Sequence, residues 1–149
     1  MAVWLVFHDP RFDYRCLVAG ALLPDLVDGP LGGARVMHSV AGSVGLLMVV
    51  MFSTVGKRLR RKRWLALPIG TFLHLVFDGA FNNTKVFWWP FSGLGFHNAP
   101  LPSLDRSPGL VVVMELAGLA MCWWAMRQFG LHDAEARRRL WRTGVLEPC

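Results

Sequence analysis

The sequence predicts an all-α membrane protein, built as a small polytopic helical bundle. Several apolar runs approach the roughly 20 residues that a helix needs to cross the hydrocarbon core of a bilayer, and 54% of the residues are hydrophobic. Basic residues cluster at the ends of these runs, as the Lys and Arg that orient membrane helices do. The 149 residues suffice for one domain and are too few for two ordinary ones. We therefore predict a single membrane domain over residues 1–149.

The first predicted element is a short helix over residues 14–26. Its apolar run, residues 16–23, is too short to cross a bilayer unaided. We expect it to be partly embedded or re-entrant and to end at Pro24-Asp25. A turn with Gly and Pro, residues 28–33, then breaks the helix.

Three clear transmembrane helices are predicted over residues 35–56, 64–81 and 109–128. Between the last two spans, Phe87, Trp88, Trp89 and Phe91 bunch together, which is typical of an interfacial aromatic belt; the alternative is a lipid-facing lid over a site. Residues 132–142 form a C-terminal amphipathic helix with Arg on its polar side. We expect this interfacial helix to lie in the inner headgroup layer.

The net charge of +6 sets the predicted orientation. Nucleic acid is not an expected partner, because the basic residues do not cover a soluble face with interleaved aromatics. They fill the loop 57–63 and follow the last span. The positive-inside rule then places that loop and the C-terminus in the cytoplasm. The three cysteines have no metal-ligand spacing and predict neither a zinc knuckle nor a disulfide framework.

Ionisable residues inside the apolar segments predict a polar site. His74 and Asp78 are four positions apart and so share one face of a helix, and such groups at membrane depth are expensive and therefore functional candidates. At about 1.5 Å per residue, both fall in the outer half of the bilayer. His38, near the start of the first span, lies near the outer surface, and Asp25 and Asp28 join it if the first segment also ends outward. The three stretches are therefore expected to share a site.

Carboxylate and imidazole groups from three segments, closed around one point, suit a divalent cation that cancels their buried charge. Gly70, on the face of His74, would let a neighbouring helix approach closely, and Asn82 would support the ligands from outside. The alternative is a structural protein in which these groups only form hydrogen bonds between helices, with no metal.

The order of four motifs resembles a known family. The motifs are Gly20-Ala-Leu-Leu-Pro-Asp-Leu-Val-Asp28, His38-Ser39, His74-Leu-Val-Phe-Asp78 and Phe87-Trp-Trp-Pro-Phe-Ser92. Together they resemble the small bacterial membrane-bound metal-dependent hydrolases of the YdjM-like family, which are distantly similar to zinc-dependent phospholipase C. The resemblance covers about residues 8–92. It implies an integral protein of the bacterial cytoplasmic membrane.

The resemblance also implies metal ligation by Asp25, His38, His74 and Asp78, with Asp28 as a further ligand or base. His8 stands where the family carries a histidine, and it joins the site only if the chain doubles back near residues 9–10. His97, in the outer loop, is a second additional candidate.

The expected function is hydrolysis of a phosphoester in a lipid or lipid-linked substrate at the outer face of the membrane. A bound Zn²⁺ lowers the pKa of its water to about 7 and stabilises charge on a phosphoryl oxygen, while Asp28 or Asp25 accepts a proton. Arg35, Lys85 or Arg106 would hold an anionic headgroup. The substrate class, a phospholipid or a polyprenyl phosphate, follows from position and family analogy.

A second candidate function, a carrier instead of an enzyme, uses the same residues. A small carrier or accessory membrane subunit would bind a proton or a divalent ion through intramembrane Asp and His, without hydrolase activity. No pair of inverted repeats is visible in the sequence, and such repeats are common in transporters. We therefore rank the carrier second.

Overall fold

The structure is a computed structural model that describes residues 3–4, 12–95 and 107–146. All regular elements in these residues are helices, and none is a strand, which confirms the all-α class. The chain groups into two compact units. One is Cys16–Asp105, and the other combines Met1–Arg15 with Arg106–Cys149. Each unit is described by itself, and the single membrane domain stays a prediction.

Helix α2 spans Tyr14–Asp28, so the predicted end at Pro24-Asp25 is wrong. A proline inside a helix has no N–H and leaves the carbonyl four residues earlier without its partner, here the carbonyl of Gly20. The hydroxyl of Thr71 donates to that carbonyl at 3.0 Å. Because this bond replaces the one that Pro24 removes, the helix continues for one more turn and carries Asp25 and Asp28.

Helix α5, Ala66–Phe77, crosses α2 in backbone contact. A Cβ atom at Gly70 would overlap the carbonyl oxygen of Leu17, and one at Gly20 would overlap that of Leu67. Two glycines thus face each other's helix, and each removes the side chain that would hold the helices apart. The expectation that Gly70 allows a close helix approach is confirmed.

The predicted turn after α2 is confirmed, and it folds back onto the end of that helix. It contains a 3-10 turn, η1, at Gly29–Leu31 and a left-handed Gly32 with φ of 88°. A second 3-10 turn, η2, follows at Val36–His38. The Oδ2 atom of Asp28 accepts the backbone N–H groups of Arg35 at 2.9 Å and His38 at 3.1 Å. One buried carboxylate therefore fixes the return of the chain.

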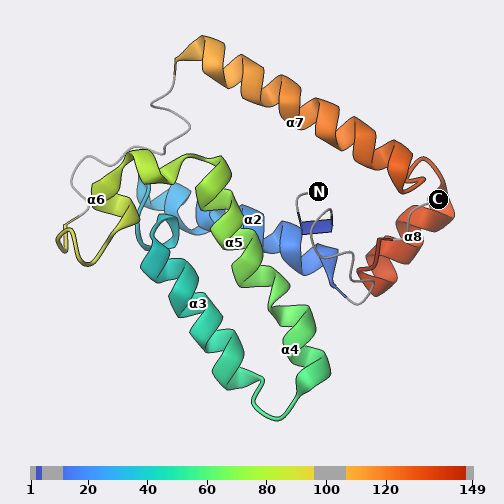
Figure 1. Cartoon of the computed structure of the whole chain (residues 1–149), viewed down its shortest axis with the longest axis horizontal. Helices are drawn as coiled ribbons and strands as arrows, with labels where there is room; N and C mark the ends of the chain where they lie inside the picture. The colour runs from blue at the N-terminus through green and yellow to red at the C-terminus, as the bar shows by residue number, and fades with distance from the viewer. Residues whose placement is uncertain (1–2, 5–11, 96–106, 147–149) are drawn as a thin grey trace. The chain divides into compact units, whose positions relative to one another are not determined.

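Helices α3, Val40–Ser53, and α5 lie side by side (Figure 1). They correspond to the predicted spans 35–56 and 64–81 but have only 14 and 12 residues. At 1.5 Å per residue they are about 21 and 18 Å long, against a hydrocarbon core of about 30 Å. Both helices depart from the predicted boundaries, and neither is long enough to count as a clear span, so the prediction of three clear transmembrane helices is wrong for these two.

Local sequence explains why both helices are short. Ser39 caps α3, because its hydroxyl accepts the N–H of Gly42 at 3.0 Å and so fixes the first turn at that point. Helix α5 begins after Leu65 because the ring of Pro68 clashes with a continuous helix at the carbonyl of Trp64. It ends at Asp78, where the left-handed Gly79, with φ of 61°, turns the chain.

Residues 57–63, predicted as a basic loop, are mostly helical. Lys57 precedes helix α4, Arg58–Trp64. The guanidinium of Arg61 donates to the hydroxyl of Thr54 at 3.4 Å and to its carbonyl at 3.3 Å, which fastens α4 to the end of α3. After α5 come the 3-10 turn η3, Ala80–Asn82, and helix α6, Thr84–Phe87.

The other unit contains helix α7, Pro108–Gln128, with 21 residues, close to the predicted span 109–128. In the part of the chain that the structure describes, it is the one helix that is long and apolar enough to cross a membrane. Helix α8, Ala134–Thr143, lies close to the predicted 132–142. Its end is held by Arg15, which pairs with the buried Asp13 at 2.8 Å and donates to the carbonyl of Trp141 at 2.7 Å.

The crossing of α2 and α5 predicts a stability difference between two glycine substitutions. Gly70→Ala forces two backbones apart and should lower the free energy of unfolding by about 1–3 kcal/mol, as overpacking does. Gly45→Ala, in α3, adds a methyl group to open space and should leave stability unchanged or raise it by up to about 1 kcal/mol. Thermal unfolding in detergent, followed by circular dichroism, measures both; equal melting temperatures would contradict the described crossing.

Candidate metal centre

Three side chains from separate elements converge on one point. Asp25 lies near the end of α2, His38 ends η2, and His74 lies in the last turn of α5. One donor atom from each lies within 4.8 Å of the other two. The Oδ1 atom of Asp25 is 3.3 Å from Nε2 of His38 and 3.5 Å from Nε2 of His74. The predicted convergence of these residues is therefore present in the fold.

The Nε2 atoms of the two imidazoles are buried and lack a hydrogen-bond partner within the described residues. The His38 side chain is fully buried and that of His74 is 15% exposed. Buried polar atoms are normally paired, and an unpaired one costs free energy. A cation bound to both nitrogens and to Asp25 would satisfy all three groups.

The distances agree with such a cation. Zinc binds nitrogen and oxygen at about 2.0–2.2 Å, usually with tetrahedral angles, which places neighbouring ligand atoms about 3.3–3.5 Å apart. The two measured separations from Asp25, 3.3 and 3.5 Å, match this value. The residues present therefore fit a divalent metal.

Asp28 orients one of the ligands. Its Oδ2 atom lies 2.9 Å from Nδ1 of His38 and already accepts two backbone N–H groups. Since this oxygen acts as an acceptor, Nδ1 of His38 is the donor in this bond, and Nε2 faces the centre. Histidines that bind metals commonly hold a carboxylate in this way through the other ring nitrogen.

The centre is open on the side of Asp25, whose side chain is 52% exposed. Structural zinc sites close around four protein ligands, whereas catalytic sites have three and keep one position for water or substrate. Two imidazoles and one carboxylate, with an exposed side, have the composition of the second kind. The arrangement can therefore bind a metal and admit another molecule to it.

The other residues predicted as ligands or substrate contacts are not part of this group of donors in the described residues. Asp78 caps α5, with its backbone N–H donating to the carbonyl of His74 at 2.8 Å, but its carboxylate is outside the group of three donors; its ligation stays a prediction. Arg35 and Lys85 are exposed, and the guanidinium of Arg35 donates to the carbonyl of Leu31 at 2.6 Å. His8, His97 and Arg106 lie outside the described residues.

Two notable polar residues were not singled out from the sequence. Ser43 is buried in α3, and a serine in an apolar segment carries no signal that separates it from a packing residue. Glu115 lies within α7, the helix that could span a membrane. The rule that singled out His74, an ionisable group at membrane depth, would also have found Glu115.

Comparison of the chain with protein-family models, curated proteins and solved structures found no match. The fold and the site therefore define the class: an all-helical protein with one possible membrane span and a His/Asp group that could hold a metal. The resemblance to the YdjM-like hydrolases rests on the sequence motifs alone.

The geometry predicts that the purified chain retains about one divalent metal ion per molecule. His74→Ala and Asp25→Ala each remove one of three donors and should reduce the retained metal to background after dialysis. His132→Ala, which removes an exposed histidine outside the group, is the matched control and should keep the full amount. Elemental analysis of detergent-purified protein gives the answer; equal metal content in all four proteins would argue against the site.

The contact of Asp28 with His38 predicts that a change at Asp28 weakens metal binding without abolishing it. Asp28→Asn should weaken metal affinity by about 10–100-fold, the range found when the carboxylate behind a metal-binding histidine is changed. Competition with a chelator measures the affinity, and ¹⁵N NMR of His38 reports which ring nitrogen carries the proton. An unchanged affinity with an altered tautomer, or unchanged values for both, would show that Asp28 serves only the fold.

Proposed function

We propose that the chain is a membrane-embedded, metal-dependent hydrolase that acts on a phosphoester of a lipid or lipid-linked substrate. The observation that carries the proposal is the open group of Asp25, His38 and His74, whose two buried Nε2 atoms face one carboxylate oxygen. A three-donor site of this composition is suited to hydrolysis. The nitrogen-rich donor set favours zinc over magnesium or calcium.

Exposed apolar surface supports a place in the bilayer for the unit that holds the site. Large apolar side chains are exposed along α2, α3 and α5, among them Leu22, Val49, Phe52 and Phe77. Surface of this extent usually contacts lipid or another protein. Helices α3 and α5 are shorter than the hydrocarbon core is thick, a mismatch that local thinning of the bilayer accommodates at modest cost.

The basic residues supply the proposed orientation. Helix α4 is at the end of α3 and α5 away from the site, because it joins the C-terminal end of α3 to the N-terminal end of α5. Placing α4 in the cytoplasm, by the positive-inside rule, puts Asp25, His38 and His74 toward the outer face. The basic helix α8 then contacts the inner headgroups.

Each residue has a part in the proposed reaction. When bound, a divalent cation acts as a Lewis acid that polarises a phosphoryl oxygen and lowers the pKa of water. The oxygen of a water molecule attacks phosphorus, the bond from phosphorus to the alcohol oxygen breaks, and the alcohol leaves with a proton. Asp25 is the better placed base, since its side chain is half exposed, whereas Asp28 is buried and its Oδ2 is engaged by His38.

Arg35 is the candidate to bind the headgroup. Its side chain is exposed, and its backbone is tied to Asp28 only three residues before His38. A guanidinium suits phosphate because it presents a planar fork of donors. Lys85, on α6, is a second cation for an anionic group and acts as a point charge.

The proposal predicts turnover that depends on the three donors. Zinc-loaded wild type in nanodiscs should release a phosphorylated headgroup or phosphate from a lipid substrate, and His74→Ala should reduce the rate to that of empty nanodiscs. His132→Ala should retain the wild-type rate. Arg35→Ala should raise KM several-fold with little effect on kcat if it binds substrate and transition state alike.

The same preparation separates the hydrolase from the carrier. Ion flux into proteoliposomes, measured alongside headgroup release, should stay at the level of protein-free vesicles. Metal-dependent flux without turnover on any lipid phosphoester would replace the hydrolase with the carrier.

A further inference from the structure

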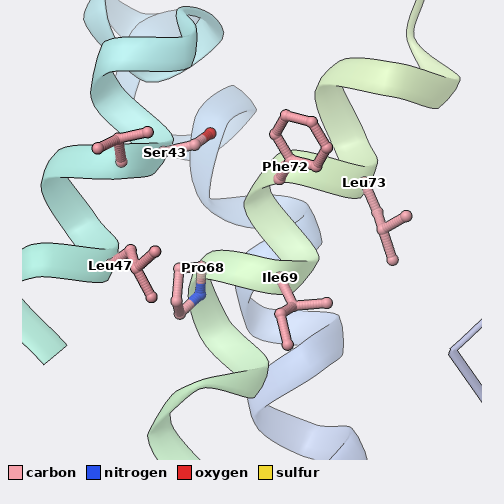
Figure 2. A pocket seen from close by; sticks show the side chains of 7 residues that line it. Ser43, Leu47, Pro68, Ile69, Phe72 and Leu73 are labelled. Atoms are coloured by element: carbon pink, nitrogen blue, oxygen red, sulfur yellow. The ribbon is translucent and has the colours of Figure 1, made fainter. Parts of the chain in front are cut away.

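An apolar groove of about 270 Å³ runs between α3 and α5 (Figure 2). Its walls carry almost no polar surface. It is smaller than the roughly 300–1,000 Å³ typical of small-molecule pockets, so it suits part of one chain better than a whole lipid. The lining residues are Ser43, Val44, Leu47, Pro68, Ile69, Phe72 and Leu73.

One hydroxyl in this groove has no hydrogen-bond partner. Ser43 is 4% exposed, and its Oγ atom is buried and unpaired within the described residues. The hydroxyl points from α3 toward Phe72 of α5 (Figure 2). A buried unpaired hydroxyl costs free energy, and the apolar walls offer it nothing. A ligand that is mostly hydrocarbon but carries one acceptor would satisfy both the walls and the hydroxyl.

The groove adjoins the metal centre along both helices. His38 and Ser39 directly precede α3, and Ser43 lies one turn, about 5.4 Å, after Ser39. On α5, Phe72 and Leu73 directly precede His74. The groove and the metal centre are therefore built from neighbouring turns of the same two helices, with Ser43 about one helical turn along α3 from Ser39.

We propose that this groove holds an acyl chain of the substrate and that Ser43 donates a hydrogen bond to the ester carbonyl of that chain. The inference rests on the proposed function and narrows its substrate class to ester-linked glycerophospholipids. In these lipids a phosphate is followed, within a few bonds, by an ester carbonyl and then by a long hydrocarbon. The anionic phosphate complements a cation at the centre, and the uncharged groove complements the chain.

A polyprenyl phosphate fits the same observations less well. It offers a phosphate and an apolar chain, but no carbonyl, so Ser43 would stay unpaired. The ester is thus the feature by which the groove separates the two substrate classes.

The test compares lipids and variants in the full chain by native mass spectrometry. The probes are phosphatidylglycerol with ester-linked chains, its ether-linked analogue without carbonyls, and undecaprenyl phosphate. The zinc-loaded protein is used, and a methylene group replaces the bridging oxygen of the scissile bond in each probe so that no lipid is consumed. Ser43→Ala removes the hydroxyl, and Val44→Trp fills the groove. Val49→Trp, on an exposed α3 residue that does not line the groove, is the matched control.

The wild type should bind the ester lipid about three- to tenfold more tightly than the ether lipid, the worth of one hydrogen bond. Ser43→Ala should remove that difference without changing affinity for the ether lipid. Val44→Trp should weaken both lipids, whereas Val49→Trp should bind like wild type. Equal affinity of wild type for ester and ether lipids, tighter binding of undecaprenyl phosphate, or undiminished binding by Val44→Trp would each overturn the proposal.

Metal content, measured on the untreated proteins, keeps this test separate from the proposed function. Ser43→Ala and Val44→Trp leave Asp25, His38 and His74 in place and should retain wild-type metal. A wild type without metal would defeat the hydrolase but leave the lipid preferences of the groove measurable. A wild type with metal and without lipid preference would defeat only the acyl-chain groove.

Discussion

The bond between Asp28 and His38 is the interaction on which the rest of the site depends. One buried carboxylate oxygen accepts the N–H groups of Arg35 and His38 and the Nδ1 proton of the same histidine. The bonds join two residues that are ten positions apart and set the direction of the imidazole in one step. Because Nδ1 is committed, Nε2 can only face Asp25 and His74. Fold and site are thus fixed by the same side chain.

The position of Asp28 depends in turn on how α2 meets α5. Pro24 frees the carbonyl of Gly20, and Thr71 uses it, while Gly20 and Gly70 let the backbones touch. This contact sets the height of Asp25 relative to His74, one turn beyond the crossing on each helix. Small residues and one hydroxyl therefore determine the distance between donors that are 49 positions apart in the sequence.

Much of the site was predictable because ionisable side chains in apolar segments carry a free-energy penalty. An imidazole or a carboxylate in an apolar segment needs a reason, and that reasoning identified Asp25, His38 and His74 as neighbours. This reasoning does not assign a role to each residue. Asp28 was expected as a ligand or base, and its contact with Nδ1 of His38 depends on the path of the turn, which the sequence does not show. The carboxylate of Asp78 shares a helix face with His74, but the end of α5 at that residue places it at a cap.

Helix lengths were less predictable than helix existence. Hydropathy over 35–56 and 64–81 could not show that Asp28 would draw residues 35–38 into a turn, or that Pro68 would divide the second segment. The end of α2 was missed because compensation for Pro24 comes from Thr71, which is remote in sequence. Helix α7, a single helix of 21 predominantly apolar residues, lies close to where its apolar run predicts.

X-ray absorption spectroscopy of the zinc-loaded protein tests whether Asp25, His38 and His74 bind the metal, because it reports the atoms bound to it. Ligation by these residues should give a shell of nitrogen and oxygen at about 2.0–2.2 Å, with the multiple scattering of two imidazoles and no sulfur. A sulfur shell at about 2.3 Å, or a shell without imidazole, would show that the metal is bound elsewhere in the chain and not by Asp25, His38 and His74.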